Sequence, residues 1–214
     1  RTKMHDSIPE AKTGIPDAVK SIPRMIPGAN PVSCRTAARR VAAGELMKAS
    51  LEGDQMRVRI LLELGVSPNE QERILGTTAL MVACLAGQTD IARDLLDHGA
   101  HVDLRDNDGR TALMEACMAG DKDLVTMLVD RGADVHAQSR HGTTPLLAAC
   151  ISGKPDVIRI LLERGADVNA PNGIGTTPFL EAAASGCAES VKLLRSWGGD
   201  TRPSAVDSDT TLRV

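Results

Sequence analysis

Aromatic residues are almost absent from this sequence. Phe179 and Trp197 account for the aromatic content of 1%, and there is no tyrosine among the 214 residues. Hydrophobic residues still amount to 42%, which is enough for a sizeable core. A single globular core of this size normally uses aromatic rings to fill the space between its layers. Their scarcity therefore favours elements that lie close together and pack through Ala, Leu and Val.

An excess of positive charge and a long hydrophobic run are also missing. The 25 Lys and Arg residues against 28 Asp and Glu residues give a formal net charge of −3, so the chain lacks the basic footprint that nucleic acid requires. No apolar run reaches the roughly 18 residues of a membrane span, and no secretory leader opens the sequence. We therefore expect neither nucleic-acid binding nor membrane insertion. Because the first residue is Arg1 rather than Met, we expect the chain to be a fragment.

Three sets of residues recur every 33 positions. They are Gly76, Gly109, Gly142 and Gly175; Gly99, Gly132, Gly165 and Gly198; and Cys84, Cys117 and Cys150. Three markers in one register indicate a tandem repeat. Because each repeat needs neighbours to bury its hydrophobic face, this period predicts a stacked array rather than one globular core.

Each block has the pattern of a helix–turn–helix unit. A Thr stands at the N-cap position of the first helix in four blocks, and Pro follows it at the first helical position in two of them. These residues are Thr78, Thr111, Thr144 and Thr177, with Pro145 and Pro178. A short Ala-rich helix ends at a glycine, and a second helix carries apolar residues at helical spacing, as in Val157, Ile160 and Leu161. Gly165 and its equivalents then occupy the left-handed C-cap position.

The 33-residue period and the turn Thr144-Pro145-Leu146 resemble the ankyrin-repeat family over about residues 43–201. The stretch GADVNA at residues 165–170 carries the same resemblance. It implies an all-α solenoid of about five helix–turn–helix repeats with short β-hairpin loops. The histidine of the family motif, which bonds neighbouring repeats there, is replaced by Met or Leu. The replacements are Met81, Met114, Leu147 and Leu180, so we expect apolar packing in its place and weaker polar coupling between repeats.

The repeat domain is predicted to span residues 35–201. Its repeats are expected at about 43–74, 75–107, 108–140, 141–173 and 174–201. The first repeat lacks the Thr-Pro turn, which is typical of a cap at the end of an array. Arg35, Arg39 and Arg40 are predicted on a short helix that leads into this first repeat, as solvated charges.

Both flanks are predicted to be less ordered. Residues 1–34 contain four Ile-Pro pairs, and proline at this density predicts an extended or disordered leader. The alternative is a segment that lies against the repeats or presents its Ile-Pro anchors to a partner. Residues 202–214 are predicted to be a flexible tail, whose end, Leu212-Arg213-Val214, has the pattern of a C-terminal PDZ ligand.

The repeated cysteines are predicted to be buried free thiols. Stacked helices lie about 8–10 Å apart, whereas a disulfide needs Cα atoms within about 7 Å. Cys84, Cys117 and Cys150 are therefore too far apart to pair or to share a metal, and Cys187 is expected to be more exposed. The odd total of five cysteines agrees with a reducing compartment, the cytoplasm or the nucleus.

Acidic and histidine residues do not converge on a reaction centre either. Glu115 and Glu181 lie two repeats apart, about 16–20 Å by helix spacing, which exceeds the roughly 5–9.5 Å of paired-carboxylate hydrolysis. The repeat register would allow His101, Asp103 and His136 to come near one another, but zinc ligands usually show tighter spacing. Surface histidines in turns are therefore the favoured interpretation. No phosphate loop, nucleophile elbow or HExxH occurs. We predict no enzymatic activity, no cofactor and no metal.

Exposed apolar residues on the first helices predict a binding surface. In the ankyrin architecture these helices and the hairpin tips line a concave groove, and Leu85, Met118 and Ile151 take the exposed inner position. Contiguous exposed hydrophobic residues indicate a partner site; the alternative is packing against neighbouring repeats. Further contacts are predicted at Glu115, Arg110, Arg140, His141 and Ile174. An apolar floor with a polar rim is typical of a protein or peptide interface.

We therefore predict a protein-interaction scaffold or adaptor that binds a protein or peptide in this groove. The alternative is a regulatory domain of a larger enzyme or channel that acts within the same polypeptide, because a fold by itself names no partner. The resemblance also implies a modification site at Asn169. This residue matches the hairpin asparagine that the oxygen-sensing asparaginyl hydroxylase modifies in ankyrin repeats, and the alternative is a purely structural hairpin asparagine.

Overall fold

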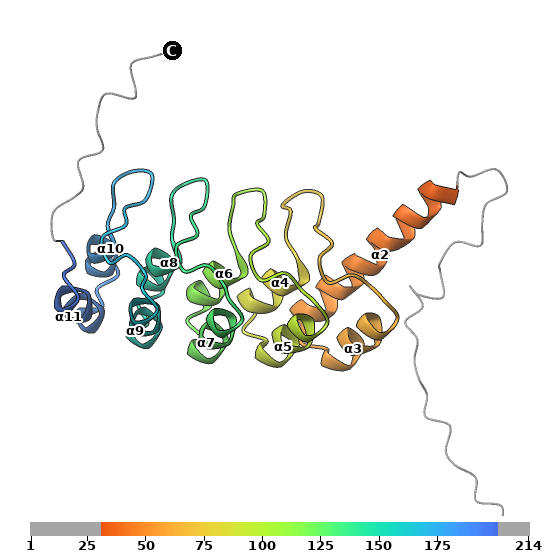
Figure 1. Ribbon diagram of the computed structural model, residues 1–214, viewed down its shortest axis with the longest axis horizontal. Helices are drawn as coiled ribbons and strands as arrows, with labels where there is room; N and C mark the ends of the chain where they lie inside the picture. The colour runs from red at the N-terminus through yellow and green to blue at the C-terminus, as the bar shows by residue number, and fades with distance from the viewer. Residues whose placement is uncertain (1–30, 201–214) are drawn as a thin grey trace, which may run out of the picture.

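Pairs of helices stacked in a row form the described part of the chain. The computed structural model describes residues 31–200, and Figure 1 shows them as a row of paired helices with loops projecting from one edge. The leader up to residue 30 and the predicted tail, with Leu212-Arg213-Val214, lie outside the described residues. None of the helices within residues 31–200 is both long enough and apolar enough to span a membrane.

The helices form two layers. The inner layer contains α2 (Pro31–Glu52), α4 (Ala79–Leu85), α6 (Ala112–Ala119), α8 (Pro145–Ser152) and α10 (Pro178–Ala184). The outer layer contains α3 (Gln55–Glu63), α5 (Thr89–Asp97), α7 (Lys122–Asp130), α9 (Pro155–Glu163) and α11 (Ala188–Ser196). Each inner helix packs against the next inner helix and against its own outer helix. The predicted all-α solenoid of five helix pairs is confirmed.

The predicted caps begin and end the inner helices. In α8, Thr144 Oγ1 accepts a hydrogen bond from Leu147 N at 3.2 Å, and Pro145 occupies the first turn. Helices α6 and α8 end at Gly120 and Gly153, whose φ angles are 74° and 64°. Only glycine adopts this left-handed conformation without strain at Cβ. The sequence therefore sets the start of α4, α6, α8 and α10 locally, through a threonine cap in each.

The first helix differs from the prediction. Helix α2 is one continuous helix of 22 residues, so the predicted leader of residues 1–34 ends four residues too late. Arg35, Arg39 and Arg40 lie on this same helix rather than on a separate short one. The fixed φ of Pro31 suits the first helical position, and residues 32–43 contain no Gly or Pro that would end the helix. In Figure 1 the start of α2 projects beyond the stack.

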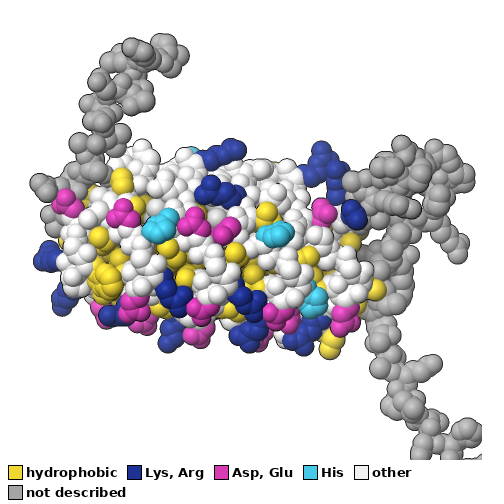
Figure 2. All heavy atoms as spheres, viewed as in Figure 1, with side chains coloured by type: hydrophobic (Ala, Val, Ile, Leu, Met, Phe, Trp, Pro, Cys, Tyr) yellow, Lys and Arg dark blue, Asp and Glu magenta, His cyan; other side chains and the backbone are white. Residues whose placement is uncertain are grey.

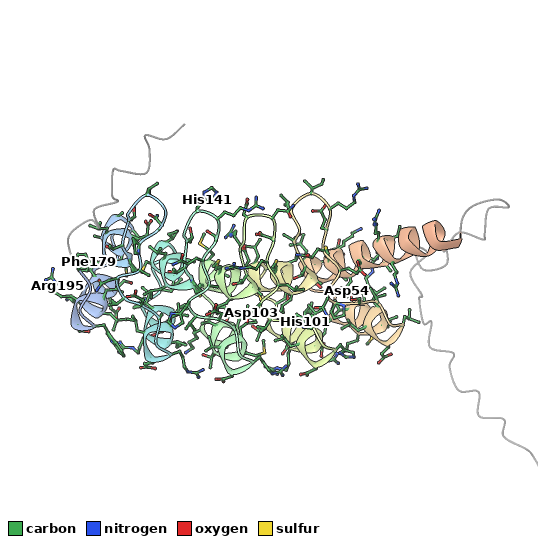
Figure 3. The ribbon with its side chains drawn as sticks, turned by 45° about the horizontal axis from the view of Figure 1, so that its top comes forward. Asp54, His101, Asp103, His141, Phe179 and Arg195 are labelled. Atoms are coloured by element: carbon green, nitrogen blue, oxygen red, sulfur yellow. The ribbon has the colours of Figure 1, made fainter. Side chains whose placement is uncertain are left out.

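Leucines at equivalent positions form the core between the layers. Fully buried leucines come from the inner helices at Leu46, Leu80, Leu113 and Leu146, and from the outer helices at Leu61, Leu95, Leu128, Leu161 and Leu194. Phe179 takes the inner position in the last repeat, and the Arg195 guanidinium lies over its ring, 5.6 Å from the centroid (Figure 3). Leucines at equivalent positions, together with Ala, Val, Ile, Met and Cys, fill most of the core, which explains why it contains so few aromatic rings.

Four loops project from the inner layer, and we call them the fingertip loops. They span residues 70–77, 104–110, 137–143 and 170–176. Each is closed by a backbone hydrogen bond across its neck, such as Asp106 N to Arg110 O at 3.0 Å or Ser139 N to Thr143 O at 3.0 Å. Within residues 31–200 these hairpins contain no assigned strand. The predicted hairpin loops are therefore present as tight turns.

Neighbouring fingertip loops are joined by hydrogen bonds. Asn107 N donates to Leu75 O at 2.8 Å, and Arg140 N donates to Asp108 O at 2.7 Å. Met81, Met114 and Leu147, which replace the motif histidine, are buried, and the fourth replacement, Leu180, is half-buried. Polar coupling between repeats therefore persists through the loops. The expectation of weaker polar coupling between repeats stays a prediction.

Candidate functional site

The groove floor consists of one apolar residue near the end of each of three inner helices. Leu85 on α4, Met118 on α6 and Ile151 on α8 have 56%, 36% and 44% of their surface exposed. Exposure at these positions was predicted, and the structure confirms it. More than half of the Met118 and Ile151 side chains is covered by the protein, so packing against neighbouring repeats stays an alternative to partner binding.

A cavity of about 230 Å³ opens between the second and third fingertip loops, above α6 and α8. Met118 and Ile151 contribute to its lining, together with Arg110 and His141 from the two loops. The structure thus brings together four of the predicted contact residues. Leu85, Arg140 and Ile174 lie outside this cavity, on the neighbouring inner helix and on the loops. An apolar floor with polar walls suits a side chain held by an extended segment.

Glu115 differs from the prediction, because it is not an exposed contact. Only 7% of the residue is exposed, and its Oε1 atom lies 3.0 Å from Arg110 Nε. Burial raises the pKa of Glu115, and the neighbouring Arg110 guanidinium opposes that rise. Glu115 therefore fixes the position of Arg110 in the cavity wall. Sequence alone misses this, because the burial depends on how the Arg110 side chain folds back onto α6.

The fingertip loops carry exposed residues of two kinds. Ile74 in the first loop and Ile174 in the last loop have 79% and 83% of their surface exposed. Arg140 and His141 are exposed in the third loop, and Figure 3 shows His141 at its tip. The predicted contacts Arg140, His141 and Ile174 are therefore accessible. Single exposed apolar residues are common on protein surfaces, so these two isoleucines do not by themselves mark a binding site.

The cysteines are arranged as predicted. Cys84, Cys117 and Cys150 are buried free thiols, and burial raises the pKa of each, that of Cys150 to about 12. Thiols held in the neutral form are poor nucleophiles. Cys187 is more exposed, and its pKa is lowered because the Ser190 hydroxyl donates to its sulfur at 3.1 Å. The repeated cysteines therefore act as small core residues.

His101 and Asp103 take part in hydrogen bonds between neighbouring repeats. His101 N donates to Asn69 Oδ1 at 2.7 Å, and Asp103 Oδ1 accepts from Asp134 N at 3.0 Å. Figure 3 shows both residues on the loops between repeats. Within residues 31–200, no group of three or more His, Cys, Asp or Glu side chains is arranged to hold a metal ion. The hydrogen bonds of this region link neighbouring repeats.

Asn169 also links repeats. Its Oδ1 accepts from Asp200 N at 2.7 Å, and its Nδ2 donates to Gly198 O at 3.2 Å. Both polar atoms of the carboxamide are thus used within the protein, which is what the structural interpretation of this asparagine requires. Hydroxylation at Asn169 stays a prediction.

A second cavity, which the sequence does not predict, lies beside His136. It measures about 110 Å³ and is lined by Val135, His136, Asp167 and other residues of the third and fourth repeats. His136 occupies the position equivalent to Asn69, Asp103 and Asn169. A histidine in an otherwise Asn/Asp series is the signal that could have pointed to this site.

Comparison with known proteins agrees with this architecture. A family model of ankyrin repeats in three copies matches residues 46–139 and 132–204. A curated relative, the 2-5A-dependent ribonuclease of Mus musculus, is 44% identical over 64 residues. That match covers 30% of this chain and 9% of the ribonuclease. The likeness therefore concerns a short stretch of repeats and extends to little of the relative's own length.

Proposed function

Because this chain belongs to the ankyrin-repeat family, we propose that it is an interaction scaffold or adaptor that binds a protein or peptide partner in its groove. Ankyrin repeats generally mediate protein–protein interaction, and the fold itself is not catalytic. The proposal goes further, since it assigns binding to the groove floor and the fingertip loops of this chain.

The observation that carries the proposal is the cavity at Met118 and Ile151. These side chains lie half-exposed beside one another, although the core is already complete without them. Covering apolar surface is worth about 25 cal/mol per Å², so exposed residues of this kind favour a bound partner. Arg110 and His141 in the walls supply the polar groups that fix the orientation of a bound segment.

The test uses a displayed library of random peptides, panned on the full chain. Peptides enriched on the wild-type chain are then titrated against a variant that carries Met118→Gln and Ile151→Thr. We expect affinity to fall at least about tenfold, because loss of a central apolar anchor typically costs more than about 1 kcal/mol per residue. The free energy of unfolding should change by only about 0.5 kcal/mol per substitution.

The matched control is Met56→Gln. Met56 is an exposed methionine on α3, in the outer layer away from the groove. We expect it to leave peptide affinity unchanged. Equal loss of affinity in the Met56 variant, or wild-type affinity in the groove variant, would contradict groove binding.

A second candidate function is that of a regulatory domain in a larger protein. The relative with the matching repeats is an enzyme by name, and the match covers only 9% of its length. Sequencing the complete transcript decides between the two, because this candidate requires a catalytic or channel domain on the same polypeptide. For either function we propose a reducing compartment, the cytoplasm or nucleus, since three buried free thiols persist without oxidation there.

A further inference from the structure

The fingertip loops expose basic side chains far more than acidic ones. Arg73, Arg105 and Arg140 are exposed on three successive loops, whereas Asp108 is the one fully exposed carboxylate on the loops that the structure describes. Figure 2 shows Lys and Arg side chains at the upper edge, where Figure 1 places these loops, and others along the lower edge, where they alternate with Asp and Glu. This edge therefore offers positive charge to any segment that lies in the groove.

Two other carboxylates of the loops are turned inward and bound by their own backbone. Glu72 accepts from Ile74 N and from Leu75 N, both at 2.8 Å, and these bonds lower its pKa. Asp106 Oδ1 accepts from Asp108 N at 2.9 Å and from Arg110 N at 2.7 Å. Both carboxylates are half-buried, as is Glu70. Their hydrogen bonds to the backbone shape the loops.

On and just after the outer helices some arginines are paired, although Arg159 and Arg195 form no ion pair within residues 31–200. Arg59 lies 2.8 Å from Asp94, and Arg131 and Arg164 each lie 2.7 Å from an aspartate of the preceding repeat. Arg73 and Arg140 form no such ion pair among the described residues. Arg73 and Arg140 therefore offer positive charge without a carboxylate partner at the groove edge, beside the exposed apolar floor.

We propose that the groove binds an extended, acidic segment of a partner protein with an apolar anchor. A side chain of the Leu, Ile or Met type enters the cavity at Met118 and Ile151, and Asp or Glu residues beside it face Arg73 and Arg140. This inference rests on the proposed function and adds the chemistry of the partner. Arginine suits the role because its planar fork binds carboxylates with two parallel hydrogen bonds.

A flat anionic membrane fits these observations less well than a peptide. The apolar floor lies on the inner helices between and below the loops, and Met118 and Ile151 line a cavity. A single extended chain reaches such a floor, whereas a bilayer surface would meet the loop tips alone. Only a narrow ligand can contact Arg73 and Arg140 on the loops and Met118 and Ile151 on the groove floor at the same time.

The composition of the enriched peptides is the first test. Peptides enriched on the full wild-type chain should combine Leu, Ile or Met with an excess of Asp and Glu over Lys and Arg. Their affinity should fall as NaCl rises from about 0.05 M to about 0.5 M, because exposed charge pairs are screened by salt. Neutral or basic enriched peptides, or affinity independent of salt, would overturn the inference.

Arginine substitutions provide the second test. In a chain carrying Arg73→Gln and Arg140→Gln, we expect the affinity of an acidic peptide to fall about 1.5- to 5-fold for each arginine. The same peptide with Gln in place of Glu should bind both chains equally. Arg93→Gln with Arg159→Gln removes the same charge from the exposed side of α5 and α9, and this matched control should leave affinity unchanged. If the control loses as much peptide affinity as the Arg73→Gln, Arg140→Gln chain, acidic peptides do not depend specifically on the arginines of the fingertip loops.

The two proposals fail in different ways. If enriched peptides depend on Met118 and Ile151 but carry no acidic excess, groove binding stands and the acidic partner is refuted. If no enriched peptide depends on the groove residues, both proposals fall. Sedimentation with vesicles of anionic phospholipid completes the test. If the chain binds these vesicles through Arg73 and Arg140 but binds no acidic peptide, the inference of a peptide partner is overturned.

Discussion

The stack of helices and the row of fingertip loops are built on different principles. The stack repeats the same residues throughout: a threonine cap on four inner helices and a buried leucine on five outer helices. The row of loops changes from one end to the other. Asn107 and Gln71 side chains join the first two loops through bonds of 2.8 and 2.7 Å, in addition to a backbone bond. The last two loops share a backbone bond from Gly173 N to His141 O.

The difference is sharpest at one equivalent position below the loops. Asn69, Asp103 and Asn169 each accept a hydrogen bond from a backbone amide of the following repeat. His136 stands at this position in the third repeat, and among the described residues no such bond is formed by its ring. The small cavity lies there instead. The helices therefore fix the register of the array, while the loops determine how firmly each pair of repeats is joined.

The largest effect is expected in the stack. Leu128 on α7 is fully buried, so Leu128→Ala should lower the free energy of unfolding by about 2–5 kcal/mol. Met118→Gln, on the groove side of α6, should change it by only about 0.5 kcal/mol. Urea denaturation of the two variants measures both values. If Met118→Gln costs as much as Leu128→Ala, Met118 belongs to the core and the groove assignment fails.

A smaller effect is expected below the loops. Asn69→Ala removes two bonds to the second repeat, one to His101 N and one to Gly99 O, and should cost about 1–3 kcal/mol at about 0.5–1.5 kcal/mol each. His136→Ala, at the equivalent position, should change the free energy of unfolding by no more than about 0.5 kcal/mol. Urea denaturation of the two variants compares the contact between repeats at Asn69 with the contact at His136. Equal losses in the free energy of unfolding would show that the two contacts do not differ in strength.

Restoring an asparagine at position 136 should raise the free energy of unfolding by a smaller amount. His136→Asn places the residue type of Asn69 and Asn169 opposite Asp167 N, and one added hydrogen bond is worth about 0.5–1.5 kcal/mol. Hydrogen exchange offers a local measurement, because the Asp167 amide should exchange faster in the wild-type chain than the bonded amides of Asp134 and Asp200. In the variant it should slow to match them. Unchanged exchange at Asp167 would show that the cavity, not the missing bond, weakens this contact between repeats.

Much of the stack could be predicted from the sequence, because its signals are local. The threonine caps, the glycine ends and the 33-residue period each depend on a few neighbouring residues. The bonds of the loops could not be predicted, since they depend on side chains that reach across to the next repeat, as Asn107 does. Exposure of the floor at Met118 and Ile151 followed from helical register. The burial of Glu115 did not, because it depends on the loop residue Arg110.

The ion pair of Glu115 and Arg110 joins the inner helix α6 to the second fingertip loop. It should give the smallest effect on the free energy of unfolding, and this effect should depend on pH. Burial raises the pKa of Glu115 in the folded state above its ordinary value, so the folded protein holds this proton more tightly than the unfolded chain does. Stability from this group is therefore full below the ordinary pKa of a glutamate and declines as pH rises through the folded value. In a series of urea titrations, Glu115→Gln should gain stability relative to wild type as pH rises from about 4 to about 7. In a chain with Arg110→Gln the decline should be steeper than in wild type, because the guanidinium that opposes the rise is gone. If the wild-type chain instead becomes more stable than Glu115→Gln as pH rises, the attraction of Arg110 outweighs the cost of burying Glu115. The helix and the loop are then held together by a net favourable charge pair.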